Sequence, residues 1–164
     1  MKQRVLSLLC ATLCLCLLAG CADPVGKTVV CKDLCVTLAA DYMDLSAESY
    51  ATDADLFYGR GTLIVMALAE AKTDLQPMTL EEYTAYVISG NRLDCTPVAY
   101  GAGYRFSYLS PVGDTTYAYT IATTETDSNF WIFQFYCPKD TLTENTGEID
   151  IILQSIQPYS LKGN

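Results

Sequence analysis

The chain of 164 residues contains no histidine. Histidine is a common general base, the most common metal ligand and the usual partner of nucleophilic serine or cysteine, so its absence closes several routes to catalysis. A hydrolase that uses carboxylates or a metal-bound water stays open as an alternative, but no motif points to one. We therefore expect no catalytic residue, no metal site and no cofactor.

The chain also lacks a hydrophobic run long enough to span a membrane. Its mainly apolar N-terminal run, Val5–Leu18, has 14 residues, whereas a spanning helix needs about 20. Lys2 and Arg4 precede this run, and small residues follow it. A short apolar run between a basic start and small residues is typical of an export signal.

The run ends in the tetrapeptide Leu18-Ala19-Gly20-Cys21. This tetrapeptide resembles the lipobox of a bacterial lipoprotein signal peptide. The resemblance implies cleavage before Cys21, lipid such as palmitate on Cys21, and a location at the extracytoplasmic face of the cell membrane, where several acyl chains give stable anchoring. We predict a signal peptide over residues 1–20 and a short tether over residues 21–27. The alternative is an ordinary signal peptide cleaved nearby, with Cys21 incidental.

Positive charge is scarce, and it becomes scarcer once residues 1–20 are removed. The remaining 144 of the 164 residues keep eight of the ten Lys and Arg residues and all 19 Asp and Glu residues, a formal net charge of −11. No surface for nucleic acid is therefore expected. Anionic lipid headgroups would repel this domain, so the lipid on Cys21 has to hold it at the membrane.

Besides Cys21, the mature chain contains four cysteines, namely Cys31, Cys35, Cys95 and Cys137. An even number outside the cytoplasm suggests disulfides. Three residues separate Cys31 from Cys35, one more than in redox and zinc motifs. If those three residues form a tight loop, the two thiols face each other and could bond. The pairing of Cys95 with Cys137 and a site of four thiols for a metal stay open.

Two hairpins are predicted at the start of the folded region. Residues 28–31 and 35–38 are β-branched or apolar and predict a first hairpin. Residues 55–58 and 62–68 are two further apolar runs, and the glycine-containing segment 59–61 between them predicts the turn of a second hairpin.

A helix is predicted over residues 79–90. Thr79 can cap it, and Glu82 stands three residues later, as in a capping box. The apolar side chains at helical spacing are Leu80, Tyr83 and Val87.

Three strands are predicted after this helix. They cover residues 98–109, with a bulge or bend at Gly101 and Gly103, then residues 117–123 and 130–136. The segment 130–136 is almost continuously apolar, so we expect a central strand that is covered on both faces.

A second helix closes the domain. We expect Asn145 or Thr146 to cap it and Pro158 to stop it. The apolar side chains on one face of this helix are Ile149, Ile152, Leu153 and Ile156.

These elements predict one α+β domain over residues 28–158, with a mostly antiparallel, twisted sheet of about six strands covered by two helices. Residues 159–164 form a C-terminal tail. The Tyr-rich meander, the Phe- and Trp-rich strand that ends in Cys137, and the closing segment Ile152-Leu153-Gln154-Ser155-Ile156 resemble the PsbP-like/DcrB-like α-β-α sandwich family. The resemblance implies a non-catalytic accessory or binding domain, which in bacteria is often exported and lipid-anchored.

All 12 tyrosines lie in the mature domain. Those of the meander are Tyr100, Tyr104, Tyr108, Tyr117 and Tyr119. Tyrosine offers a large contact area with a polar tip, so Tyr104, Tyr108, Tyr117 and Tyr119 form a candidate binding face. The alternative is that tyrosine favours half-buried strand positions.

From these observations we expect a lipid-anchored, extracytoplasmic accessory or binding protein without catalytic activity. Its partner would be a membrane protein or a small ligand. A hydrolase based on carboxylates or metal, and a thiol-based redox module that uses Cys31 and Cys35, are the alternatives.

Overall fold

Residues 26–48 and 53–160 are described by the structure, which is a computed structural model. The predicted signal peptide over residues 1–20, the predicted lipidation site Cys21, most of the tether and residues 161–164 lie outside this part of the chain. Within the described ranges, no helix is both long enough and apolar enough to cross a membrane.

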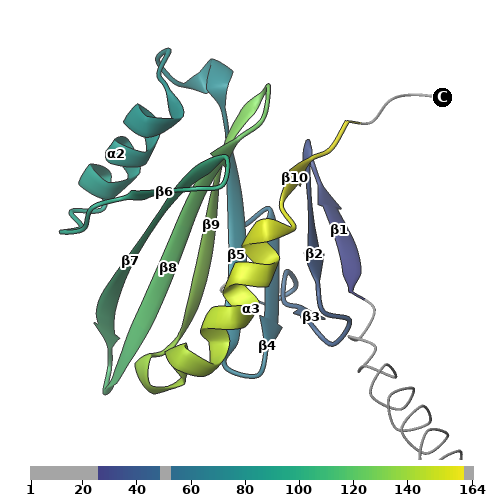
Figure 1. Ribbon diagram of the computed structural model, residues 1–164, viewed down its shortest axis with the longest axis vertical. Helices are drawn as coiled ribbons and strands as arrows, with labels where there is room; N and C mark the ends of the chain where they lie inside the picture. The colour runs from purple at the N-terminus through teal and green to yellow at the C-terminus, as the bar shows by residue number, and fades with distance from the viewer. Residues whose placement is uncertain (1–25, 49–52, 161–164) are drawn as a thin grey trace, which may run out of the picture.

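Ten β-strands and two α-helices make up the described ranges (Figure 1). The strands are β1 (Lys27–Cys31), β2 (Leu34–Leu38), β3 (Met43–Asp44), β4 (Leu56–Arg60), β5 (Leu63–Ala71), β6 (Val98–Tyr100), β7 (Gly103–Val112), β8 (Thr115–Glu125), β9 (Asn129–Pro138) and β10 (Gln157–Pro158). The α-helices are α2 (Leu80–Gly90) and α3 (Leu142–Gln154), and the 3-10 turns are η1 (Lys72–Asp74) and η2 (Lys139–Thr141).

The strands form two antiparallel sheets. Seven strands follow the order β3-β4-β5-β9-β8-β7-β6, and three follow the order β1-β2-β10. β9 lies in the middle of the larger sheet and pairs with β5 and β8, so the predicted central strand is confirmed. The expected number of about six strands is too low. Residues 98–109, predicted as one strand, form β6 and β7, and the short strands β3 and β10 carry no pattern of their own. The first hairpin builds a separate sheet with β10.

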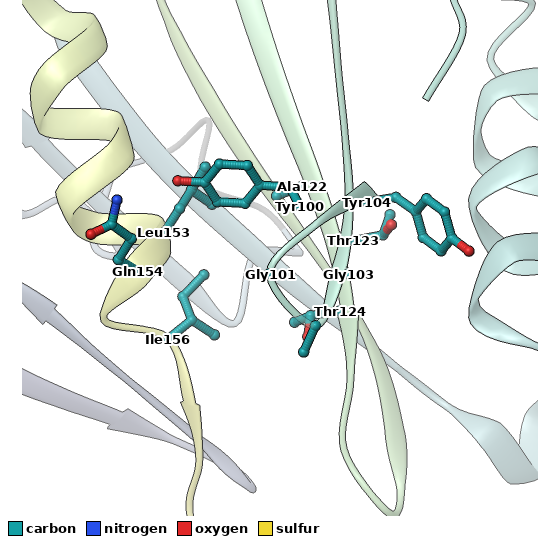
Figure 2. Close-up of a pocket in the computed structure, with 11 residues that line it drawn as sticks. Tyr100, Gly101, Gly103, Tyr104, Ala122, Thr123, Thr124, Leu153, Gln154 and Ile156 are labelled. Atoms are coloured by element: carbon teal, nitrogen blue, oxygen red, sulfur yellow. The ribbon is translucent and has the colours of Figure 1, made fainter. Parts of the chain in front are cut away.

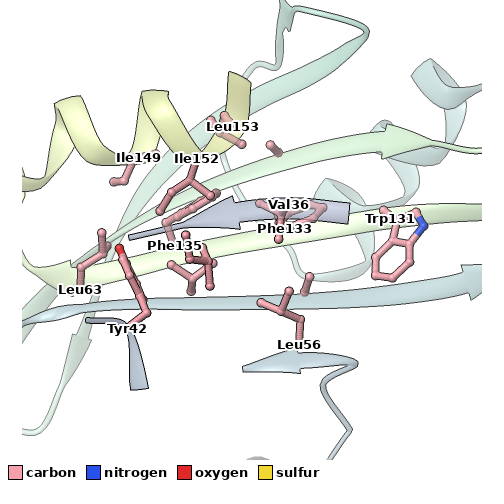
Figure 3. Close-up of a cluster of buried hydrophobic side chains, with 14 of the residues drawn as sticks. Val36, Tyr42, Leu56, Leu63, Trp131, Phe133, Phe135, Ile149, Ile152 and Leu153 are labelled. Carbon is pink, nitrogen blue, oxygen red and sulfur yellow. The ribbon is translucent and has the colours of Figure 1, made fainter. Parts of the chain in front are cut away.

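One face of the larger sheet, which we call the core face, is covered by α3 and the three-stranded sheet (Figure 1). Phe133 and Phe135 of β9 are 0% exposed there, and Ile149 and Ile152 of α3 are each 1% exposed. Figure 3 shows these helix side chains lying over the β9 side chains. This face therefore holds the main hydrophobic core.

The opposite face, which we call the tyrosine face, is covered by α2 at one end. Leu80 and Tyr83 of α2 pack there with Phe106, Ile121 and Phe130 of the sheet. The ring of Tyr83 stacks on that of Phe130, with 4.4 Å between the ring centroids. A second, smaller core therefore fixes α2 on the sheet.

Tight turns of two residues connect four of the strand pairs. The first residue of each turn has a positive φ, with values of 51° at Lys32, 55° at Gly61, 57° at Gly101 and 59° at Gly113. Hairpin turns of this length require such a conformation, which glycine adopts without strain. The β6–β7 turn replaces the bulge or bend predicted at Gly101 and Gly103. The turn of the second hairpin begins at Gly61, because Gly59 pairs with Ile64 within the ladder.

α2 begins as the sequence predicts. The backbone N–H of Glu82 donates to the Thr79 hydroxyl at 3.2 Å, and the backbone N–H of Thr79 donates to the Glu82 carboxylate at 2.8 Å. These two bonds confirm the predicted capping box.

α3 begins earlier than predicted, at Leu142, so the expected cap at Asn145 or Thr146 is wrong. Both side chains instead donate to carbonyl groups four residues before them. Asn145 reaches Thr141 at 2.9 Å, and Thr146 reaches Leu142 at 2.8 Å. Polar side chains in a first helical turn can satisfy the backbone in this way as well as by capping it.

Candidate functional site

The tyrosines of the meander gather on one face because the strands pair in a regular register. Residues that lie opposite each other in an antiparallel pair point to the same face. Tyr108 of β7 lies opposite Tyr119 of β8, and Tyr119 lies opposite Tyr136 of β9. Tyr117, two residues before Tyr119, points to the same face. We call Tyr108, Tyr117, Tyr119 and Tyr136 the tyrosine ladder.

The rings of the ladder contact one another in series. The ring centroids of Tyr108 and Tyr119 are 4.9 Å apart with an interplanar angle of 2°, and those of Tyr119 and Tyr136 are 5.6 Å apart. Tyr117 meets Tyr136 edge-on at 6.3 Å. Burial, and then the neighbouring titratable groups, raises the pKa of Tyr108 and of Tyr119. Both hydroxyls are therefore protonated at neutral pH and can donate hydrogen bonds.

A cavity of about 290 Å³ lies beside the ladder, between α2 and the sheet. Its apolar wall includes Met66, Leu68 and Leu93, and its polar groups come from Glu70, Asn91 and Gln134. Tyr108 belongs both to this wall and to the ladder. The combined surface suits an apolar or aromatic side chain whose polar end stays at the rim.

Tyr104 is not part of the ladder, although the sequence groups it with the other three. It lies opposite Thr123, at the end of the sheet that α2 covers, and packs against the smaller core. The structure therefore brings together Tyr108, Tyr117 and Tyr119, but not Tyr104.

A groove of about 460 Å³ lies between the β6–β7 hairpin and the end of α3 (Figure 2). Tyr100 and Leu153 line it from the two sides. Gly103 allows the close approach of the strands, because a Cβ there would lie 2.0 Å from the Thr123 carbonyl oxygen. Arg105 forms an ion pair with Asp150 of α3 at 2.5 Å, which ties the two walls together.

The sequence analysis did not identify two residues of the tyrosine face, namely Tyr136 of the ladder and Met66 of the cavity beside it. The strand 130–136 carried a signal for the first one. Gln134 is its only residue that is neither apolar nor aromatic, and Tyr136 stands two positions later on the same face. A polar residue at that spacing marks the less covered face of a strand. The position of Met66 on the tyrosine face follows only from the pairing of β5 with β9, in which Met66 lies opposite Gln134.

The predicted bond between Cys31 and Cys35 is not formed, and all four cysteines of the described residues are free. The turn contains only two residues, so Cys31 pairs with Leu34 and Cys35 pairs with Val30. Adjacent register positions point to opposite faces, and the two thiols therefore point away from each other. Cys95 and Cys137 belong to different clusters, on the tyrosine face and the core face respectively.

The environment of Cys31 does not activate its thiol. Burial, followed by the charge of Asp55, raises the pKa of Cys31. The thiol donates a hydrogen bond to the Asp55 carbonyl oxygen at 3.1 Å. Because the thiolate is the reactive form, a raised pKa disfavours redox chemistry at this position.

The hydrogen bonds of Asp33 give its carboxylate a structural role. Its carboxylate accepts hydrogen bonds from Trp131 at 3.0 Å, from Asn129 at 2.8 Å and from the Thr126 hydroxyl. Partial burial opposes its ionisation, but the hydrogen bonds together outweigh this effect and lower the pKa of Asp33. The carboxylate thus fastens the β1–β2 turn to β9. In residues 26–48 and 53–160, no three Cys, Asp or Glu side chains gather in an arrangement that could hold a metal.

Solved structures of other proteins share this fold. They include cyanobacterial PsbP (CyanoP) from Synechocystis sp. PCC 6803, with a TM-score of 0.57, 11% identity and coverage of 86% of this chain and 96% of that chain. A protein from Bacteroides thetaiotaomicron VPI-5482 has a TM-score of 0.59, 11% identity and coverage of 84% and 50%. The Ran-binding protein Mog1p from Saccharomyces cerevisiae has a TM-score of 0.53, 9% identity and coverage of 81% and 95%.

At these identities, the similarity establishes the fold alone. It supports the PsbP-like α+β architecture that the sequence predicts. No protein-family model and no curated protein sequence matches the chain.

Proposed function

We propose that this chain is a lipid-anchored, extracytoplasmic accessory protein without catalytic activity, which holds a partner protein at the cell membrane through its tyrosine face. The observation that carries this proposal is the tyrosine ladder. Four tyrosines stand in contact, each partly exposed, beside a mainly apolar cavity.

The chemistry of the ladder suits a protein partner better than a reaction. Tyrosine rings supply contact area, and each loses little conformational freedom on binding because the stacked rings already restrain one another. The hydroxyls at the rim can donate hydrogen bonds without acting as nucleophiles. An apolar patch rimmed by polar groups marks an interaction surface in soluble domains.

The proposed location rests on residues 1–21, which lie outside the described part of the chain. The lipobox resemblance supports cleavage before Cys21 and lipid attachment to it. A protein with the same fold, Mog1p, is described as Ran-binding. That precedent is consistent with protein binding by this architecture, although fold alone does not assign function.

Photo-crosslinking in cells tests the proposed function. A photoreactive phenylalanine analogue replaces Tyr117 on the ladder or, as the matched control, Tyr86, which is 57% exposed on the outer side of α2. We expect the analogue at Tyr117, but not at Tyr86, to capture one membrane protein. Equal capture from both positions, or capture from neither, would contradict the proposed function.

The Cys21→Ala variant tests the anchor separately. We expect it to remain unprocessed or to be released from the membrane, because the residue that carries the lipid is gone. Membrane fractionation and the mass of the mature protein report the result. A variant that is processed normally and stays membrane-bound would contradict lipid anchoring while leaving the binding face untested by that result alone.

A further inference from the structure

β7 forms an edge of the larger sheet that is only partly paired. It runs over ten residues, Gly103–Val112, and pairs with β8 from Tyr104 to Val112. On its other side, β6 covers only Gly103, Tyr104 and Arg105. In Figure 1, the remaining part of β7 borders the sheet with no strand beside it. The segment from Phe106 to Val112, which we call the open edge, is therefore available to a further strand.

The backbone groups that this edge presents follow from strand geometry. In an antiparallel strand, the N–H and C=O of one residue point to one neighbour and those of the next residue to the other. Val112 and Thr115 close the β7–β8 turn, so the even-numbered residues bond to β8. The N–H groups of Ser107 and Leu109 then point outward. Pro111 has the same parity, and its missing N–H costs nothing at an outer position.

The side chains around these groups leave the edge accessible. Leu109 is 51% exposed and Val112 is 55% exposed. The seven residues of the open edge carry no charged side chain. An exposed, uncharged edge is a template for strand addition, which natural proteins usually block with charged residues or proline, and here only Pro111 does so, near one end.

We propose that the open edge binds an extended segment of another protein as an additional antiparallel strand, and that this segment carries alternating apolar residues with basic residues at its ends. This inference rests on the proposed function and specifies how the partner docks. A strand added here would place every second side chain on the tyrosine face, with one of them beside Tyr108, and would so extend the tyrosine ladder.

The negative charge of the domain favours a partner segment with basic ends as the occupant of the open edge. Asp114 lies two residues after Val112, the last residue of the open edge, and the mature chain has a formal net charge of −11. Among the described residues, the Asp114 carboxylate forms no ion pair. A second copy of this chain would bring the same net negative charge to the edge, whereas a segment with basic ends complements this charge and, at one end, Asp114.

A synthetic peptide tests the inference directly. The probe has three Val-Thr repeats flanked by lysine, and its control has glutamate in place of lysine. Titration into the isotope-labelled mature domain, followed by NMR, should shift the amide signals of Ser107 and Leu109 with the lysine peptide. The glutamate peptide should bind at least about tenfold more weakly, which corresponds to about 1.4 kcal/mol.

Leu109→Pro supplies the matched variant. It removes an N–H that points away from β8, as the residue two positions on, Pro111, already does. The hydrogen bonds between β7 and β8 are therefore kept. We expect at least about tenfold weaker binding of the lysine peptide. Leu109→Ala, which keeps the N–H, should bind within about threefold of the wild type. A peptide with N-methyl groups at alternate residues tests the same bonds on the unchanged protein.

Equal binding by wild type and Leu109→Pro, unchanged affinity of the N-methylated peptide, or no binding of the lysine peptide would overturn the inference. Dimerisation of the wild-type domain through the edge, detected by sedimentation and abolished by Leu109→Pro, would also overturn it in favour of a second copy. Capture of a membrane protein from Tyr117 in any of these cases would leave the proposed function standing.

Discussion

The two faces of the larger sheet differ most clearly along β9. Phe133 and Phe135 point to the core face and are 0% exposed. Ile132 and Tyr136, next to them on the same strand, point to the tyrosine face and are only half-buried. The difference comes from what lies over each face, because the strand and its pairing are common to both.

α3 and the three-stranded sheet together cover the core face, while α2 covers one end of the tyrosine face. The main hydrophobic core and the proposed binding surface therefore lie on opposite sides of one layer of strands. Residues on the core face can be expected to change the free energy of unfolding when they are replaced. Residues of the ladder can be expected to change partner binding with smaller effects on folding.

Replacing Phe133 gives the largest expected difference between the faces. Phe133→Ala should lower the free energy of unfolding by about 3–5 kcal/mol, because a fully buried aromatic ring leaves a cavity. Ile132→Ala, the neighbour on the tyrosine face, should cost less than half as much because its side chain already contacts solvent. Urea denaturation of the mature domain measures both. Equal losses would show that the two faces contribute equally to stability.

Asp33→Asn should have the second-largest effect, since Asp33 fastens the hairpin that covers the core face. A neutral amide has one acceptor oxygen for three donors, so a loss of about 1–3 kcal/mol is expected. The lowered pKa means that the carboxylate stabilises the fold fully above its unfolded pKa of about 3.9, and that this contribution disappears as the pH falls through the lower folded value.

Urea denaturation above and below a pH of about 3.9 measures this dependence. We expect the difference between wild type and Asp33→Asn to shrink on acidification. Asp127→Asn, at an exposed carboxylate in the adjacent turn, serves as the control and should leave stability nearly unchanged. A difference that stays constant with pH would show that the charge of Asp33 is not what matters.

Thr79→Ala should have the smallest effect of the three and should act on the tyrosine face. Loss of the capping box is expected to cost about 1 kcal/mol and to increase hydrogen exchange in α2. Thr79→Ser keeps the hydroxyl and should restore most of the protection. Faster exchange in α3 as well would mean that the two helices do not report separately on the two faces.

Local sequence signals predicted the parts of the fold that local chemistry determines. The capping box of α2, the first hairpin and the central position of β9 follow from short patterns in the chain. The pairing of β10 with β2 does not, because it joins residues more than a hundred positions apart and β10 has only two residues. The start of α3 was misplaced because Asn145 and Thr146 bond backward inside the helix.

The candidate site was predictable only in part. Period-two alternation in β8 correctly placed Tyr117 and Tyr119 on one face. The exclusion of Tyr104 and the inclusion of Tyr136 depend on the cross-strand register and on where α2 lies, which sequence alternation does not specify. The disulfide prediction assumed a turn of three residues between Cys31 and Cys35. The actual turn has two residues, which places the two thiols on opposite faces of the hairpin.

The position of β1 has a mechanical consequence. Tension applied to the N-terminal side of the fold enters at Gly26, at the open end of the β1–β2 hairpin, where Lys27 lies opposite Leu38. A pull along β1 loads its hydrogen bonds to β2 in shear, so they resist together. A pull across β1 peels the same pairs apart one at a time, beginning at Lys27. The direction of the tension would therefore decide whether the hydrogen bonds of the small sheet break together or one after another.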